Sequence, residues 1–150
     1  IQMADAVVIL YEMIHDVRVI PLDNRPRVHD EVRQWMGDSR GHWDGDTLVV
    51  TTTNFNDRGM IASSGGGGRI KGIPVSEALY VVERFTRTSE NEVLWEVTIE
   101  DPEVYEGPWT VSMPLTKDPD YVMFEYACHE GNRYVPLLLE GRLREEQETQ

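Results

Sequence analysis

The stretch that decides the fold lies near the middle of the first half of the chain. It reads Gly41-His42-Trp43-Asp44-Gly45-Asp46-Thr47-Leu48-Val49-Val50. Strand-forming residues flank Asp44-Gly45, a pair that supplies the positive φ angles a tight hairpin turn requires. The stretch therefore predicts a β-hairpin, whose second strand is expected to continue to Phe55.

Further strand patterns occur on both sides of this hairpin. They cover residues 6–11 and 17–22 upstream, and residues 79–86, 93–100, 111–115 and 122–129 downstream. Strict alternation, clearest at 93–100, is typical of half-buried antiparallel strands. Turn signals between the strands predict a mainly β fold, an antiparallel meander that forms a small barrel or a strongly curved sheet. A short helix is expected near the C-terminus, at residues 135–144.

Length and composition predict a single β-barrel-like domain over residues 1–150, because 40% hydrophobic residues fill one core. Within it, Gly65-Gly66-Gly67-Gly68 predicts a flexible loop at about 60–74, and a frayed tail is expected at about 145–150. Cys128 is the single cysteine, which excludes an intrachain disulfide. We expect it to be a small buried residue.

The strong acidity of the chain bears on its partners. Lys and Arg number 14 against 27 Asp and Glu, which gives a formal net charge of −13. Such a surface repels phosphate backbones, so no nucleic acid partner is expected. The sequence lacks a run of about 20 apolar residues, so membrane insertion is not expected either. Its start, from Ile1 to Asp5, has no signal-peptide pattern, and a first residue of Ile suggests a processed or missing upstream segment.

The densest polar cluster lies between residues 125 and 132. Strand alternation places Glu125 and His129 on one face. With Glu125 or Glu130 as the carboxylate, His129 could perform acid/base or metal chemistry. The alternative is an exposed cross-strand ion pair. No other histidines have the spacing of a metal site, so neither a metal nor a cofactor is predicted.

A ligand-binding set is predicted from aromatic and polar residues of the strands. Its members are Trp43, Arg84, Trp109, Glu125, Tyr126 and His129. The tryptophans stand next to turns and would line or plug a hollow barrel. Arg18 and Arg84 lie inside apolar strands, where an arginine points either into a cavity toward an anionic ligand or outward to a carboxylate.

Several motifs together resemble those of a known group of proteins. They include Trp35-Met36-Gly37-Asp38-Ser39, Thr53-Asn54-Phe55-Asn56-Asp57, Val82-Glu83-Arg84-Phe85, Pro108-Trp109-Thr110 and Glu125-Tyr126-Ala127-Cys128-His129-Glu130-Gly131-Asn132. In this respect the chain resembles a large uncharacterised family of environmental bacterial β-rich, lipocalin-like proteins, which are usually longer and exported. The resemblance implies an extracytoplasmic location, periplasmic or secreted. It implies no reaction.

Three functions follow as hypotheses. The first is a small-molecule-binding module of lipocalin-like type, with a small apolar or aromatic ligand. The second is a small barrel enzyme that uses His129 with Glu125 or Glu130, and the third is a structural or interaction protein. A homodimer is also expected, because residues 6–11 carry neither charge nor proline and would form an unprotected edge strand. The alternative is a monomer in which residues 137–139 cover that edge.

Overall fold

The computed structural model describes residues 1–13, 15–61, 72–125, 136–137 and 139–141. The chain divides into two compact units, which are treated separately. One comprises residues 1–10 and 17–121, and the other comprises residues 11–16 and 122–150. Everything that follows about the sheet and its pockets concerns the first unit.

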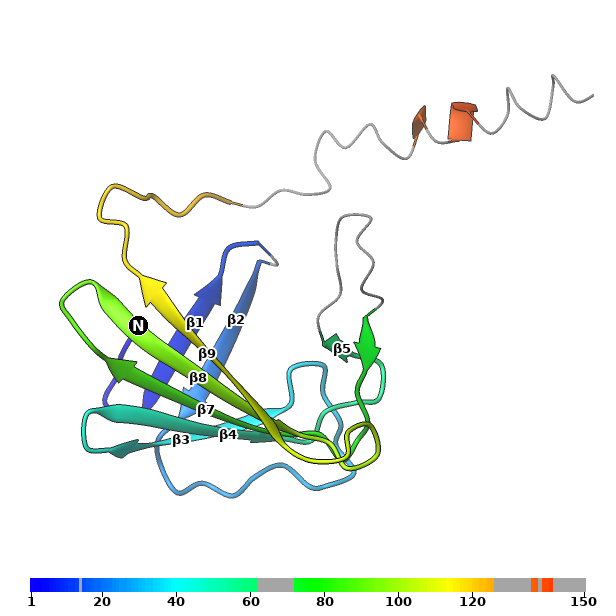
Figure 1. Ribbon diagram of the computed structural model, residues 1–150, viewed down its shortest axis with the longest axis horizontal. Helices are drawn as coiled ribbons and strands as arrows, with labels where there is room; N and C mark the ends of the chain where they lie inside the picture. Colours follow the sequence, from blue (N-terminus) through cyan, green and yellow to red (C-terminus); the bar gives the residue numbers. More distant parts are fainter. Residues whose placement is uncertain (14, 62–71, 126–135, 138, 142–150) are drawn as a thin grey trace, which may run out of the picture. The chain divides into compact units, whose positions relative to one another are not determined.

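A five-stranded antiparallel sheet forms the centre of this unit (Figure 1). In spatial order its strands are β3 (Asp38–Asp44), β4 (Thr47–Thr53), β7 (Tyr80–Arg87), β8 (Glu92–Glu100) and β9 (Trp109–Thr116). Each strand of this sheet pairs with the strand that follows it in the sheet along the chain. Residues 54–79 form an insertion between β4 and β7. This is the predicted meander.

The hairpin predicted around Asp44-Gly45 is present as β3 and β4, with Asp44 opposite Thr47. Its two-residue loop is therefore Gly45-Asp46, one residue later than the sequence pattern suggested. Of these two loop residues, only Gly45 has a positive φ, of 60°. A two-residue turn that has glycine as its first loop residue needs a positive φ at that residue only. Asp46 therefore needs no unusual backbone conformation.

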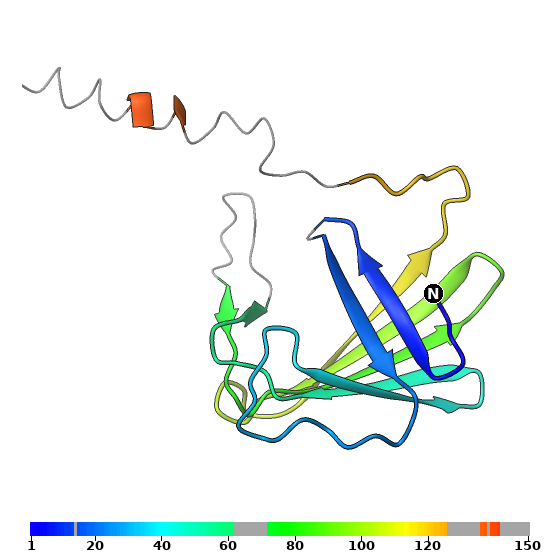
Figure 2. The ribbon, with the colours of Figure 1, turned by 180° about the vertical axis from the view of Figure 1, so that it is seen from behind.

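A second pair of strands covers part of the sheet. β1 (Ala6–Tyr11) and β2 (Asp16–Pro21) form a two-stranded sheet, called the covering hairpin below, which crosses one face of the larger sheet (Figure 2). Ile20 of this hairpin packs against Leu48 and Val50 of β4 in a common core. We call the covered side of the five-stranded sheet its inner face.

Close contact between the two layers depends on Gly41 of β3. A Cβ atom at this position would lie 2.8 Å from Ile20 and 2.9 Å from Leu22. Such distances are shorter than van der Waals contact, so only glycine lets the covering hairpin approach the sheet this closely.

A smaller core lies where the insertion returns to the sheet. Val75 and Leu79 are buried there against Ile99. Next to them Asp101 is almost fully buried and accepts hydrogen bonds from the backbone amide of Ser76 (2.8 Å) and from its hydroxyl (2.6 Å). The carboxylate thus joins the segment before β7 to the end of β8.

Several expectations need correction. The described strands do not close into a barrel, because β3 and β9 are the two edges of an open sheet. Residues 122–125 are not a strand, and the rest of that predicted strand lies outside the described residues. In the predicted loop at 60–74, β5 (Met60–Ile61) and β6 (Ile73–Pro74) pair with each other, while residues 62–71 lie outside the description. The C-terminal helix is confirmed only as a short helical stretch at 136–137 and 139–141.

Candidate functional site

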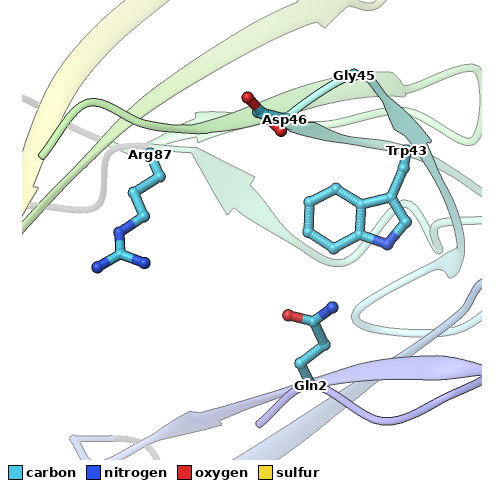
Figure 3. A pocket seen from close by; sticks show the side chains of 5 residues that line it. All are labelled: Gln2, Trp43, Gly45, Asp46 and Arg87. Atoms are coloured by element: carbon cyan, nitrogen blue, oxygen red, sulfur yellow. The ribbon is translucent and has the colours of Figure 1, made fainter. Parts of the chain in front are cut away.

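An open pocket beside the β3–β4 turn is the best candidate for a ligand site. It has a volume of about 520 Å³, within the range of small-molecule sites. Its lining residues are Gln2, Trp43, Gly45, Asp46 and Arg87. We call it the Trp43 pocket. Figure 3 shows Trp43 and Arg87 on two sides of the same space, with the Gln2 amide facing it.

Local structure explains why Trp43 is available there. It lies on the inner face of β3, in the register row of Leu48 and Phe85. Leu48 is buried, whereas Trp43 on the edge strand remains 45% exposed. A large aromatic ring that is half exposed beside a concavity provides a flat apolar surface for a ligand.

The opposite wall of the pocket carries a positively charged side chain that hydrogen bonds hold in place. Arg87, the last residue of β7, donates hydrogen bonds to the backbone carbonyls of Ser89 (3.0 Å) and Glu90 (3.3 Å). These acceptors are neutral, so they fix the guanidinium without neutralising it. With the carboxylate of Asp46 and the amide of Gln2, the pocket offers both hydrogen-bond donors and acceptors around one aromatic ring.

A buried polar network lies on the inner face beneath the covering hairpin. Arg18 of β2 forms an ion pair with Glu83 of β7 at 2.5 Å, and the two side chains are only 10% and 6% exposed. Arg18 also donates to the hydroxyls of Ser39 (2.9 Å) and Thr52 (2.8 Å), which lie 3.0 Å apart. The other oxygen of Glu83 accepts from the indole of Trp95 at 3.3 Å.

This network joins the two layers. Its groups come from β2, β3, β4, β7 and β8, and they satisfy one another's hydrogen bonds. Buried charges are tolerated when they are paired and hydrogen-bonded in this way. Of the two orientations considered for Arg18, the inward one is therefore present, although it points to a carboxylate of the protein.

The three predicted ligand-binding residues that lie in the first unit, Trp43, Arg84 and Trp109, do not form one cluster. Arg84 points outward and pairs with Asp44 at 3.0 Å. Trp109 packs edge-on against Tyr105, at the opposite end of the sheet from Trp43. Glu125 is exposed in the second unit. Tyr126, His129 and Glu130 lie outside the described residues.

Of the residues that line the Trp43 pocket, sequence reasoning predicted only Trp43 as a ligand-binding residue. It assigned Gly45 and Asp46 to the hairpin alone and missed Gln2 and Arg87. Arg87 could have been found, because strand alternation from Phe85 places it on the inner face, opposite Val93 of β8. Gln2 has no such signal. Its position depends on an isolated β-bridge to Val7, a contact that no local pattern specifies.

Metal-binding groups are scarce in the part of the chain that the structure describes. No set of three or more His, Cys, Asp or Glu side chains gathers there in a way that could hold a metal ion. His29 and His42 are both exposed. The same residues also contain no helix with the length and apolarity needed to cross a bilayer.

The described geometry defines a class, an open antiparallel β-sheet with one covering hairpin and a surface pocket. Comparison with known proteins adds no relative to this class. No family model matches the sequence, and neither the curated proteins nor the solved structures contain a significant match.

Proposed function

We propose that this protein is a small-molecule-binding module whose ligand binds in the Trp43 pocket. The observation that carries the proposal is the half-exposed indole of Trp43 in an open pocket with Arg87 on its other side. Function follows the site rather than the fold, and a concave surface with one aromatic ring and a few polar groups is typical of ligand sites.

The lining indicates the kind of ligand. A flat, partly apolar molecule would stack on Trp43, and its polar edge would meet Arg87, Asp46 and Gln2. Small aromatic compounds with hydroxyl or carboxylate groups, and carbohydrates, have this combination. A long lipid chain does not suit an open pocket with so many polar groups.

Thermal-shift screening against aromatic compounds and carbohydrates tests the proposal, followed by calorimetric titration of the best compound. Trp43→Ala should weaken binding roughly tenfold, because aromatic stacking contributes about 0.5–1.5 kcal/mol beyond buried area. Arg87→Gln should weaken binding of compounds that carry a carboxylate more than that of neutral ones.

Trp35→Ala is the matched control. Trp35 is 65% exposed but does not line the pocket. Its replacement should leave the affinity unchanged. The proposal fails if no compound raises the melting temperature, or if Trp35→Ala and Trp43→Ala weaken binding equally.

We also propose that the protein forms a homodimer through the outer side of the covering hairpin. Residues 1–3 already pair with part of the free edge of β1, through Val8 and Val7. The apolar outer side is therefore a better interface than the edge itself. Leu10, Val17 and Val19 are exposed there, which is unusual for three large apolar residues on one small hairpin.

Light scattering tests the dimer. A monomer has a mass of 17.2 kDa, and a dimer would have twice this value. Val19→Lys should return the dimer to the monomer mass, whereas Val32→Lys, at another exposed valine, should not. A monomer mass for the unmodified protein at micromolar concentration rules the dimer out.

An extracytoplasmic location is a further proposal, supported by the family resemblance of the motifs.

A further inference from the structure

A second open pocket lies on the other face of the sheet from the Trp43 pocket. Strand alternation places Arg40 and His42 of β3 on the outer face, opposite to Trp43. The pocket has a volume of about 430 Å³. Its lining comprises Asp23, Asn24, Arg25, Arg27, Arg40, Gly41, His42 and Thr51. We call it the arginine pocket.

Its charge contrasts with that of the whole protein. Three guanidinium groups and one carboxylate line the arginine pocket, in a chain with a formal net charge of −13. A local excess of positive charge in a concave surface concentrates the field there and favours anionic ligands. Guanidinium groups also match the geometry of carboxylate and phosphate oxygens.

Arg27 supplies a fixed and uncompensated charge. One terminal nitrogen donates to the backbone carbonyl of Asp38 at 2.6 Å, and the other donates to the hydroxyl of Thr51 at 2.6 Å and to the Thr51 carbonyl at 3.2 Å. All of these acceptors, and the Thr53 hydroxyl at 3.3 Å, are neutral. Within the described residues Arg27 pairs with no carboxylate, so its charge is held in place without being neutralised.

Arg40 places a second guanidinium group in the pocket, and this one is paired with a carboxylate. Its side chain is 18% exposed and is held by the carboxylate of Asp38 and by the carbonyl of Pro26, the latter at 2.9 Å. The pKa of Asp23 is lowered mainly by the side-chain hydrogen bond from Arg25, and the charge of Arg40 is a minor contribution.

Arg25 and Asp23 form the exposed part of the site. Arg25 donates to both oxygens of Asp23, at 2.7 Å and 2.6 Å, while one terminal nitrogen of Arg25 has no partner among the described residues. Exposed pairs of this kind are weak and can exchange partners. The Asp23 carboxylate therefore occupies the place that a carboxylate of a ligand would take on Arg25.

We propose that the arginine pocket binds a small oxyanion, the carboxylate or phosphate group of a small molecule, in competition with Asp23. Arg27 provides the fixed positive charge, Arg40 lies beside it with its charge shared with Asp38, and Arg25 releases Asp23 to hold the anion from the solvent side. The inference is independent of the Trp43 pocket, which lies on the opposite face of the sheet.

Inorganic phosphate and acetate are the probes, titrated at constant ionic strength with sodium chloride as reference. Both should raise the melting temperature saturably, because a ligand that binds only the folded state stabilises it. Phosphate should bind more tightly, since it carries more charge. Arg25→Gln should weaken phosphate binding roughly threefold, and Asp23→Asn should tighten it by a similar factor, as expected for one exposed ion pair.

The Arg84–Asp44 pair provides matched controls. It is also exposed, and it lies outside the arginine pocket. Arg84→Gln and Asp44→Asn change the net charge as Arg25→Gln and Asp23→Asn do, but they should leave phosphate binding unchanged. The proposal is overturned if neither probe stabilises the protein beyond sodium chloride, if Asp23→Asn weakens phosphate binding, or if the Arg84 and Asp44 variants have the same effects as the pocket variants.

Discussion

Both halves of the five-stranded sheet carry apolar residues on the inner face, but these residues are buried to very different extents. Leu48 on β4, beneath the covering hairpin, is 5% exposed. Leu115 and Met113 on β9 face the same side, and they are 44% and 40% exposed. Alternation therefore determines which face a residue joins, whereas the second layer determines whether it is buried. Both halves can be tested with matched variants.

The largest expected effect lies in the covered half. Arg18→Ala leaves Glu83 as an uncompensated buried charge and should lower the free energy of unfolding by about 3–5 kcal/mol. Urea denaturation measures the change. Arg84→Ala, which breaks an exposed pair, should cost about 0–1 kcal/mol. Equal costs for the two variants would show that the covering hairpin does not bury Arg18.

Two leucines on the same face give the next comparison. Leu48→Ala should lower the free energy of unfolding by about 2–5 kcal/mol, because it opens a cavity between the layers. Leu115→Ala should cost much less, about 0.5 kcal/mol, since the side chain is already in contact with water. Chemical denaturation of both variants gives the two values. A large cost at Leu115 would mean that something covers the β9 half as well.

Alanine substitutions at two glycines test the contact between the layers by adding a methyl group instead of removing one. Gly41→Ala should cost about 1–3 kcal/mol, because the new methyl group collides with Ile20 and Leu22. Gly107→Ala meets no atom within 4 Å and serves as the control. The melting temperature should fall only for Gly41→Ala, and an unchanged value would contradict the close approach of the hairpin.

The smallest effect concerns the exposed pair of the arginine pocket. The hydrogen bond from Arg25 lowers the pKa of Asp23 below its ordinary value of 3.8. The pair therefore stabilises the fold above pH 3.8, and this contribution is lost as the pH falls through the lower pKa of the folded state. The difference in urea midpoint between the wild type and Asp23→Asn should be small at neutral pH and vanish in acid. A difference that grows in acid would contradict the assignment.

Much of the fold was predictable because its patterns are local. The strands of the meander and the hairpin at Gly45 follow from alternation and turn residues within a few positions. Whether the sheet closes into a barrel or stays open was not predictable, because closure depends on pairing between edges that are distant in the sequence. The burial of Arg18 was equally hidden, since Val17-Arg18-Val19 has the pattern of a strand with its arginine outward.

The candidate sites were harder to predict than the fold. Trp43 was identified because an aromatic residue beside a turn is a local feature, and it does line a pocket. Its neighbours come from the chain start and from the end of β7, and only the tertiary arrangement brings them together. The arginine pocket likewise combines the connection before β3 with the outer face of β3 and β4. Neither set has a spacing that a sequence can reveal.

The buried arginine also bears on the order of events in folding. Three hydrogen-bond partners of Arg18 lie 21, 34 and 65 residues away along the chain, on three different strands. The strands of the covering hairpin are close in the sequence, so the hairpin can form quickly. It cannot dock until the partner strands are aligned, because the Arg18 guanidinium would lose water without gaining hydrogen-bond partners. We therefore expect docking after the main barrier, so that Arg18→Ala speeds unfolding and leaves the refolding rate nearly unchanged.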